Sequence, residues 1–206
     1  MTGYAPGLPT MTTPTENVSI AALYVETDGV YFGVLGVDPW DVVRDAKKYD
    51  GPHPVVAHPP CGPWGRMAQF ATKQDPACGP RAVAQVRAFG GVLEHPAESK
   101  LWDRCGLPRP GGLPDACGGW SFEVRQVSWG HPAVKPTWLY VVGMPAAGLT
   151  SLEVRTGGEP THKLRNRTAG NLPQLSRPAR SKTPPAFRDF LLSIARRCRI
   201  ETRQSE

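Results

Sequence analysis

Three short groups of residues carry side chains that could do chemistry. They are residues 59–61 (Pro-Pro-Cys), residues 94–96 (Glu-His-Pro) and the polar stretch 126–137. A cysteine thiolate is a strong nucleophile, and a nearby carboxyl group can hold or donate a proton. Cys61 and Glu94 are therefore the candidate catalytic residues.

The first two groups each follow an apolar run that is typical of a buried strand. Residues 53–58 (HPVVAH) predict one strand and residues 92–94 the next, while residues 80–89 between them predict a helix that two glycines end. Such a strand, helix, strand unit makes its strands parallel and brings their ends to one edge of the sheet. Cys61 and Glu94 should then face the same crevice, where open α/β sheets bind ligands.

Further elements are predicted on the N-terminal side of this unit. Residues 19–26 and 30–36 are apolar and flank Thr-Asp-Gly at 27–29, which predicts a β-hairpin. Asp38 followed by Pro39 predicts the start of a short helix that continues to Tyr49.

On the C-terminal side, residues 97–105 predict a helical turn, and residues 120–130 and 136–143 predict two strands. The apolar face from Phe187 to Cys198 predicts a closing amphipathic helix. We therefore expect an α/β fold with a partial, doubly wound parallel sheet and antiparallel hairpin additions.

The chain length and composition favour one globular domain. The chain has 206 residues, and Gly and Pro together are about 22% of them, below the share that marks a low-complexity chain. We expect a disordered lead-in at 1–17, a single domain at 18–199 with a basic segment at 151–199, and a tail at 200–206. Five cysteines without CxxC spacing argue against a disulfide framework.

Two further features concern partners and location. No apolar run is long enough to span a membrane and no signal peptide is recognisable, so we expect a cytoplasmic protein without a membrane partner. Residues 151–206 hold 12 Lys and Arg against 5 Asp and Glu, whereas residues 1–150 hold 12 against 13. The basic C-terminal part could bind the phosphates of a nucleic acid, or it could be a solvated basic tail.

In their order along the chain, the three groups resemble the DNA cytosine-5 methyltransferase family. That family has a Pro-Cys loop, then a Glu-Asn segment, then a strand that contains glutamine. Residues 130–140 (GHPAVKPTWLY) and 181–187 (SKTPPAF) are similar to stretches of small phage-encoded relatives. The resemblance covers about residues 55–195 and implies a Rossmann-like, methyltransferase-type sheet, and a location in the host cytoplasm if the protein is phage-encoded.

The resemblance also implies a reaction on a pyrimidine base. The Cys61 thiolate would add to carbon 6, Glu94 would assist at ring nitrogen 3, and a group would be transferred to carbon 5. Glu94 would act best as an acid with its pKa raised by partial burial. The expected partner is DNA or a nucleotide, from which the base must be flipped out or offered unpaired. The implied substrate-binding residues are Pro60, Trp64, Arg66, His95, Gln126 and Lys135.

Two departures from the family pattern concern this site. His95 stands where the family has asparagine, which replaces an amide with a titratable ring. The glycine-rich loop that binds S-adenosylmethionine corresponds to residues 26–36 here, where the pattern is degenerate or absent. The resemblance therefore implies S-adenosylmethionine as a possible cofactor, with Gly33, Gly36 and Asp38 as its candidate contacts.

Two other functions fit the same residues. The chain could be a catalytically inactive descendant that binds nucleic acid or a protein through its basic segment. Alternatively, it could be a metal-assisted enzyme, in which four side chains that metals favour act together. These are His58, Cys61, His95 and His131. The spacing of these residues matches no zinc-finger pattern, so we expect no metal ligand in the site.

Overall fold

A computed structural model describes residues 20–65, 68–71, 74–164 and 171–200 of the chain. The predicted lead-in at 1–17 and the tail from 201 onward lie outside these residues. The strands are β1 (Ile20–Leu23), β2 (Val37–Trp40), β3 (Val55–Ala57), β4 (Gly91–Pro96), β5 (Trp120–Arg125) and β6 (Pro136–Val142). The α-helices are α1 (Cys78–Phe89), α2 (Lys100–Cys105), α3 (Arg177–Ser181) and α4 (Pro185–Ala195).

The six strands form one open, mixed sheet in the order β2-β1-β3-β4-β6-β5. The first four strands of this order are mutually parallel, and β6 is antiparallel to both β4 and β5. This confirms the predicted α/β class, and the arrangement is compatible with a Rossmann-like fold. The strand, helix, strand unit is also confirmed, as β3, α1 and β4.

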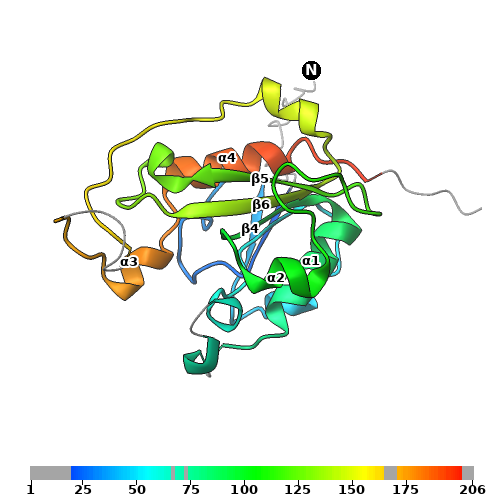
Figure 1. The fold of residues 1–206 in the computed structure, drawn as a ribbon. Coiled ribbons are helices and arrows are strands. Elements are labelled where there is room, and N and C mark those ends of the chain that lie inside the picture. The colour runs from blue at the N-terminus through cyan, green and yellow to red at the C-terminus, as the bar shows by residue number, and fades with distance from the viewer. Residues whose placement is uncertain (1–19, 66–67, 72–73, 165–170, 201–206) are drawn as a thin grey trace, which may run out of the picture.

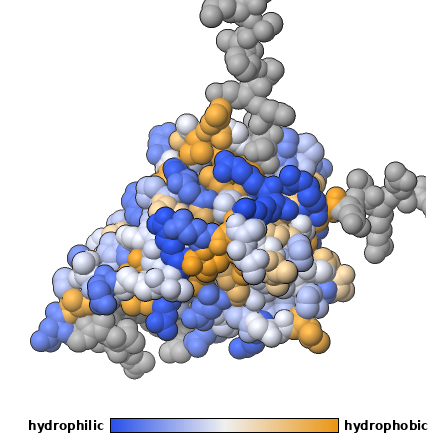
Figure 2. Space-filling model, turned by 90° about the horizontal axis from the view of Figure 1, so that it is seen from above, coloured by the Kyte–Doolittle hydropathy of each residue, from blue (hydrophilic) through white to orange (hydrophobic). Residues whose placement is uncertain are grey.

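Helices cover both faces of the sheet (Figure 1). Phe187, Leu191 and Ile194 of α4 are fully buried against one face, as the amphipathic pattern predicted. The other face packs against α1 and α2, with Val86 and Trp102 at the centre of this second layer. Seen from the α4 side, the surface is largely hydrophilic with small hydrophobic groups between (Figure 2).

The predicted hairpin around residues 27–29 is wrong. The chain does turn there, because the Gly29 N–H donates to the Glu26 carbonyl at 2.9 Å. However, β1 and β2 are parallel, and residues 24–36 form the long connection that a parallel pair requires. The aromatic side chains of this connection pack into the core instead of pairing as a strand, and Tyr31 is only 2% exposed.

The predicted helix from Asp38 to Tyr49 is also wrong. Asp38 and Pro39 lie within β2, where the missing N–H of proline is tolerated because β2 is an edge strand. The residue that caps the following turn is Asp41, whose side chain accepts hydrogen bonds from the Val43 and Arg44 N–H groups at 3.0 Å each. Only a short 3-10 turn, Ala46–Lys48, follows.

Candidate functional site

Glu94 lies near the end of β4, on the face of the sheet that α4 covers. Side chains alternate along the strand: Val92 belongs to the α4-side core and Leu93 to the core on the α1 side. Glu94 therefore points toward the α4 side and His95 toward α2. Only 10% of the Glu94 side chain is exposed. Such a buried carboxylate must find partners within the protein.

Two side chains bind the two oxygens of this carboxylate. His58 Nδ1 lies 3.0 Å from Glu94 Oε2, and Gln126 Nε2 donates to Glu94 Oε1 at 2.8 Å. The same Gln126 nitrogen donates to Thr137 Oγ1 at 3.0 Å, and Thr137 donates to the Lys135 carbonyl at 3.1 Å. Four neighbouring segments, which end or begin at this edge of the sheet, thus meet at Glu94.

Glu94 is ionised, which differs from the raised pKa expected for an acid. Burial by itself would raise the pKa of Glu94. The positive charge of Lys135 and the hydrogen bond with His58 outweigh burial and lower this pKa to about 2. The carboxylate therefore accepts hydrogen bonds in the free protein.

Tyr31 joins the same cluster from the connection between β1 and β2. Its hydroxyl oxygen lies 2.7 Å from His58 Nε2, and the two rings are tilted with centroids 5.4 Å apart. The loops after β1 and β3 leave the sheet where the strand order reverses, which is the usual ligand crevice of such sheets. In this structure the contact between Tyr31 and His58 bridges that crevice.

Cys61 is exposed on the loop that leaves β3, three residues after His58. It directly precedes a 3-10 turn, Gly62–Trp64. The Gly62 N–H donates to Gln74 Oε1 at 2.9 Å, which ties this loop to a later segment. Since β3 and β4 are adjacent and parallel, the Cys61 loop emerges beside the strand end that carries Glu94.

Trp64 anchors this loop on α1. Its indole is partly buried in the α1-side core, and a side chain at Gly79 would come within 2.6 Å of its Nε1. At least this edge of Trp64 is therefore used for packing. Arg66, the other predicted substrate contact in the loop, lies outside the described residues.

His95 is buried beside Pro60 and α2, on the face opposite to Glu94. Burial lowers its pKa to about 4, although the Glu94 charge and the Pro60 backbone act in the opposite direction. Its ring lies 6.4 Å from that of Trp102, between centroids, and neither ring nitrogen has a hydrogen bond of ordinary geometry. Pro60 and His95 thus lie close together where β3 and β4 end.

Several groups near the residues proposed to contact S-adenosylmethionine have partners within the protein. In the connection between β1 and β2, the N–H groups of Gly29, Phe32 and Val37 donate to carbonyls of the same connection. The Asp38 carboxylate binds Arg44 and the Trp40 indole. Gly33 and Gly36 have φ of 71° and 73°, which suits their turns. We derive no step through this cofactor.

The metal-assisted alternative finds no site in the described part of the chain. Within it, no three His, Cys, Asp or Glu side chains are grouped so that they could hold a metal ion. His58 bonds to Tyr31 and Glu94, and His131 Nδ1 lies 2.8 Å from the Ala133 carbonyl. These two histidines therefore take part in hydrogen-bonded clusters of the protein itself.

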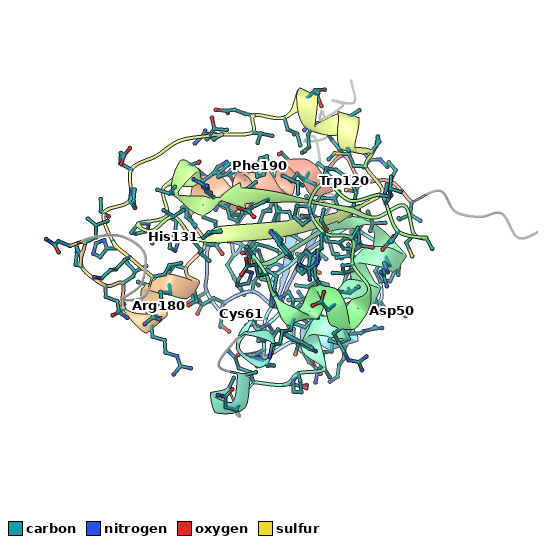
Figure 3. All side chains as sticks on the ribbon, in the orientation of Figure 1. Asp50, Cys61, Trp120, His131, Arg180 and Phe190 are labelled. Carbon is teal, nitrogen blue, oxygen red and sulfur yellow. The ribbon has the colours of Figure 1, made fainter. Side chains whose placement is uncertain are left out.

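The basic segment borders the candidate site. The Thr161 and His162 N–H groups donate to the Pro132 carbonyl, at 2.9 Å each, and Lys182 forms an ion pair with Glu26 at 3.1 Å. In Figure 3, Arg180 and His131 lie toward one end of the molecule, Cys61 lies below the sheet nearer its middle, and Trp120 lies on the other side. α3 thus lies at the edge of the sheet where β4 ends.

Three residues of the cluster are not among the site residues that the sequence predicts. The sequence suggests His58 only as a metal ligand, Thr137 lies in the polar stretch 126–137 without an assigned role, and Tyr31 is not singled out. A signal for His58 does exist, because it ends the apolar run of β3 just as Glu94 ends that of β4. No local pattern marks Tyr31, which lies 27 residues from His58.

No protein-family model matches the chain, and no curated protein matches it. Within the described residues, no helix is long and apolar enough to cross a membrane.

Proposed function

We propose that this protein is a base-modifying enzyme that acts on a pyrimidine of a nucleic acid. Cys61 is the nucleophile and Glu94 binds the ring at nitrogen 3. The observation that carries the proposal is the placement of an exposed cysteine after β3 and a buried carboxylate at the end of the adjacent parallel strand β4. Few structural roles require a charge at such a buried position.

The proposed chemistry begins with the addition of the Cys61 thiolate to carbon 6 of the base. A carbon–sulfur bond forms, the electron pair of the double bond between carbons 5 and 6 moves into the ring, and nitrogen 3 takes up one proton. Carbon 5 becomes nucleophilic and is ready for group transfer. Glu94 is ionised in the free protein and has no proton to give, so the proton on nitrogen 3 comes from the solvent when the base binds. The carboxylate then stabilises the protonated ring.

Access and charge both support a nucleic-acid substrate. Glu94 retains a small exposed surface at the edge of the sheet, and α3 places basic side chains along that edge. Arg177 and Lys182 are exposed there, and Arg180 is partly exposed. Such side chains suit the phosphates on either side of an unpaired base. Lys135 lies closer to Glu94 and balances its charge.

Trapping of the covalent adduct tests the proposal. The protein is incubated with DNA that contains 5-fluorocytosine, with several group donors including S-adenosylmethionine, and the products are separated on a denaturing gel. Fluorine at carbon 5 cannot be lost as hydrogen is, so a stable protein–DNA adduct is expected. The variant Cys61→Ala should give no adduct, whereas Cys117→Ala, which removes another exposed thiol, should behave as the wild type. If no donor yields an adduct, the inactive, binding descendant is favoured.

A further inference from the structure

His58 lies between two buried groups that come from distant parts of the chain. On one side its Nδ1 is 3.0 Å from Glu94 Oε2, and on the other its Nε2 is 2.7 Å from the Tyr31 hydroxyl. Only 12% of the His58 side chain is exposed. Both ring nitrogens therefore have protein partners, and the ring cannot rotate without losing them.

The charge of Glu94 sets the direction of one of these hydrogen bonds. Glu94 is ionised and can only accept, so His58 Nδ1 must carry the hydrogen that it donates. Burial and the Glu94 charge raise the pKa of Tyr31 well above its ordinary value, so its hydroxyl keeps its proton. The Tyr31 hydroxyl can donate to His58 Nε2 or accept from it, according to whether Nε2 carries a hydrogen. In either case the ring is held between Tyr31 and Glu94.

We propose that His58 is a positioning residue for Glu94, and that Tyr31 holds the His58 ring in the orientation in which Nδ1 binds the carboxylate. This inference rests on the function proposed above. Gln126 donates to one carboxylate oxygen and His58 to the other, so together they fix the plane of the group. A fixed plane presents the remaining lone pairs to the ring of the base in one geometry.

Three variants test the role through adduct formation. His58→Asn places an amide N–H near the position of Nδ1, whereas His58→Gln places it near Nε2 and His58→Ala has none. We expect adduct formation to slow by about 100-fold in His58→Ala and His58→Gln, and by about tenfold or less in His58→Asn. Tyr31→Phe, which loses only a hydroxyl, should also be slower than the wild type. His53→Asn, at the start of the β3 segment, is the matched control and should not change the rate.

A second measurement separates this inference from the proposed function. The carboxyl carbon of Glu94 is titrated by NMR in the free protein, without DNA. The titratable groups that interact electrostatically with Glu94 are His58, Lys135, His95, His131 and Tyr31. The Glu94 pKa should rise in His58→Ala and His58→Gln, and should stay lowered in His58→Asn.

Each outcome bears on the inference. An unchanged Glu94 titration in His58→Gln, or equal adduct rates for the Asn and Gln variants, would overturn it. If His58→Ala does not fold, the comparison of His58→Asn with His58→Gln still tests the inference. If the wild type forms no adduct, the proposed function fails, while the NMR titration still decides whether His58 controls Glu94.

Discussion

At the scale of single residues, the candidate site depends on charges that are held by distant partners. The sequence predicted Glu94 at a strand end because a polar residue closes an apolar run. The partners of this carboxylate come from positions 36 residues before it and 32 residues after it. No local pattern encodes those contacts, so the lowered pKa could not be predicted. Burial alone, which a sequence does suggest, would have given the opposite direction.

The pH dependence of stability tests whether burial keeps the His95 ring neutral. Its pKa is lowered from 6.5 to about 4 in the folded protein, so the unfolded chain binds an extra proton between these values. The contribution of His95 to the free energy of unfolding is therefore fully present above about pH 6.5. It is lost as the pH decreases toward 4, which lowers the free energy of unfolding by up to about 3 kcal/mol. In His95→Asn this loss should be smaller, as measured by urea unfolding at pH 7 and pH 5.

Burial also lowers the pKa of His131. The variant His95→Asn should therefore keep part of the pH dependence of stability. An identical loss of stability in wild type and His95→Asn between pH 7 and pH 5 would show that His95 is not held neutral by the fold.

At the scale of elements, the sequence predicted the strands and helices that bury an apolar face. β3, α1, β4 and α4 were each predicted from hydrophobic spacing. The two errors lie in residues 19–49, where turn signals were used to assign pairing. Asp28-Gly29 does make a turn, but strand pairing is decided by burial. The aromatic residues after this turn fill the core instead of forming an edge strand.

The start of β4 is the most sensitive point of the sheet. Gly91 has φ of 121°, and a side chain there would overlap the carbonyl oxygen of Val55. We expect Gly91→Ala to lower the free energy of unfolding by at least about 3 kcal/mol, because strain and overlap add. Chemical denaturation measures this change.

The matched control is Gly65→Ala, where φ is −88° and the nearest atoms would be 3.7 Å from the new side chain. This control should change the free energy of unfolding by less than about 0.5 kcal/mol. If the two variants were equally stable, the close pairing of β3 and β4 described above would be incorrect.

At the scale of the whole molecule, the structure shows where the basic side chains of the C-terminal segment lie on the surface. The sequence showed that the positive charge lies after residue 150, but not which part of the surface it occupies. The structure brings α3 to the edge where β4 ends, and it takes the end of α4 to the opposite edge, where the Arg199 N–H donates to the Gly143 carbonyl at 2.7 Å. Only the first of these basic regions borders the candidate site (Figure 1).

Paired arginine variants test this arrangement. We expect Arg177→Ala with Arg180→Ala to weaken binding to single-stranded DNA, and to reduce the slope of log affinity against log salt by about 1.4. Arg196→Ala with Arg197→Ala removes the same charge at the far end of α4 and should have a smaller effect. Fluorescence anisotropy over a range of salt concentrations measures both, and equal effects would argue against a path for nucleic acid along α3.

In the proposed function, the thiolate of Cys61 attacks the base. Mass-spectrometric mapping of the protein after reaction with DNA containing 5-fluorocytosine tests this step directly. We expect the modified base to be attached to the peptide that contains Cys61, and Glu94→Gln to reduce its yield strongly. Attachment at another cysteine, or a yield that does not depend on Glu94, would contradict the proposed function.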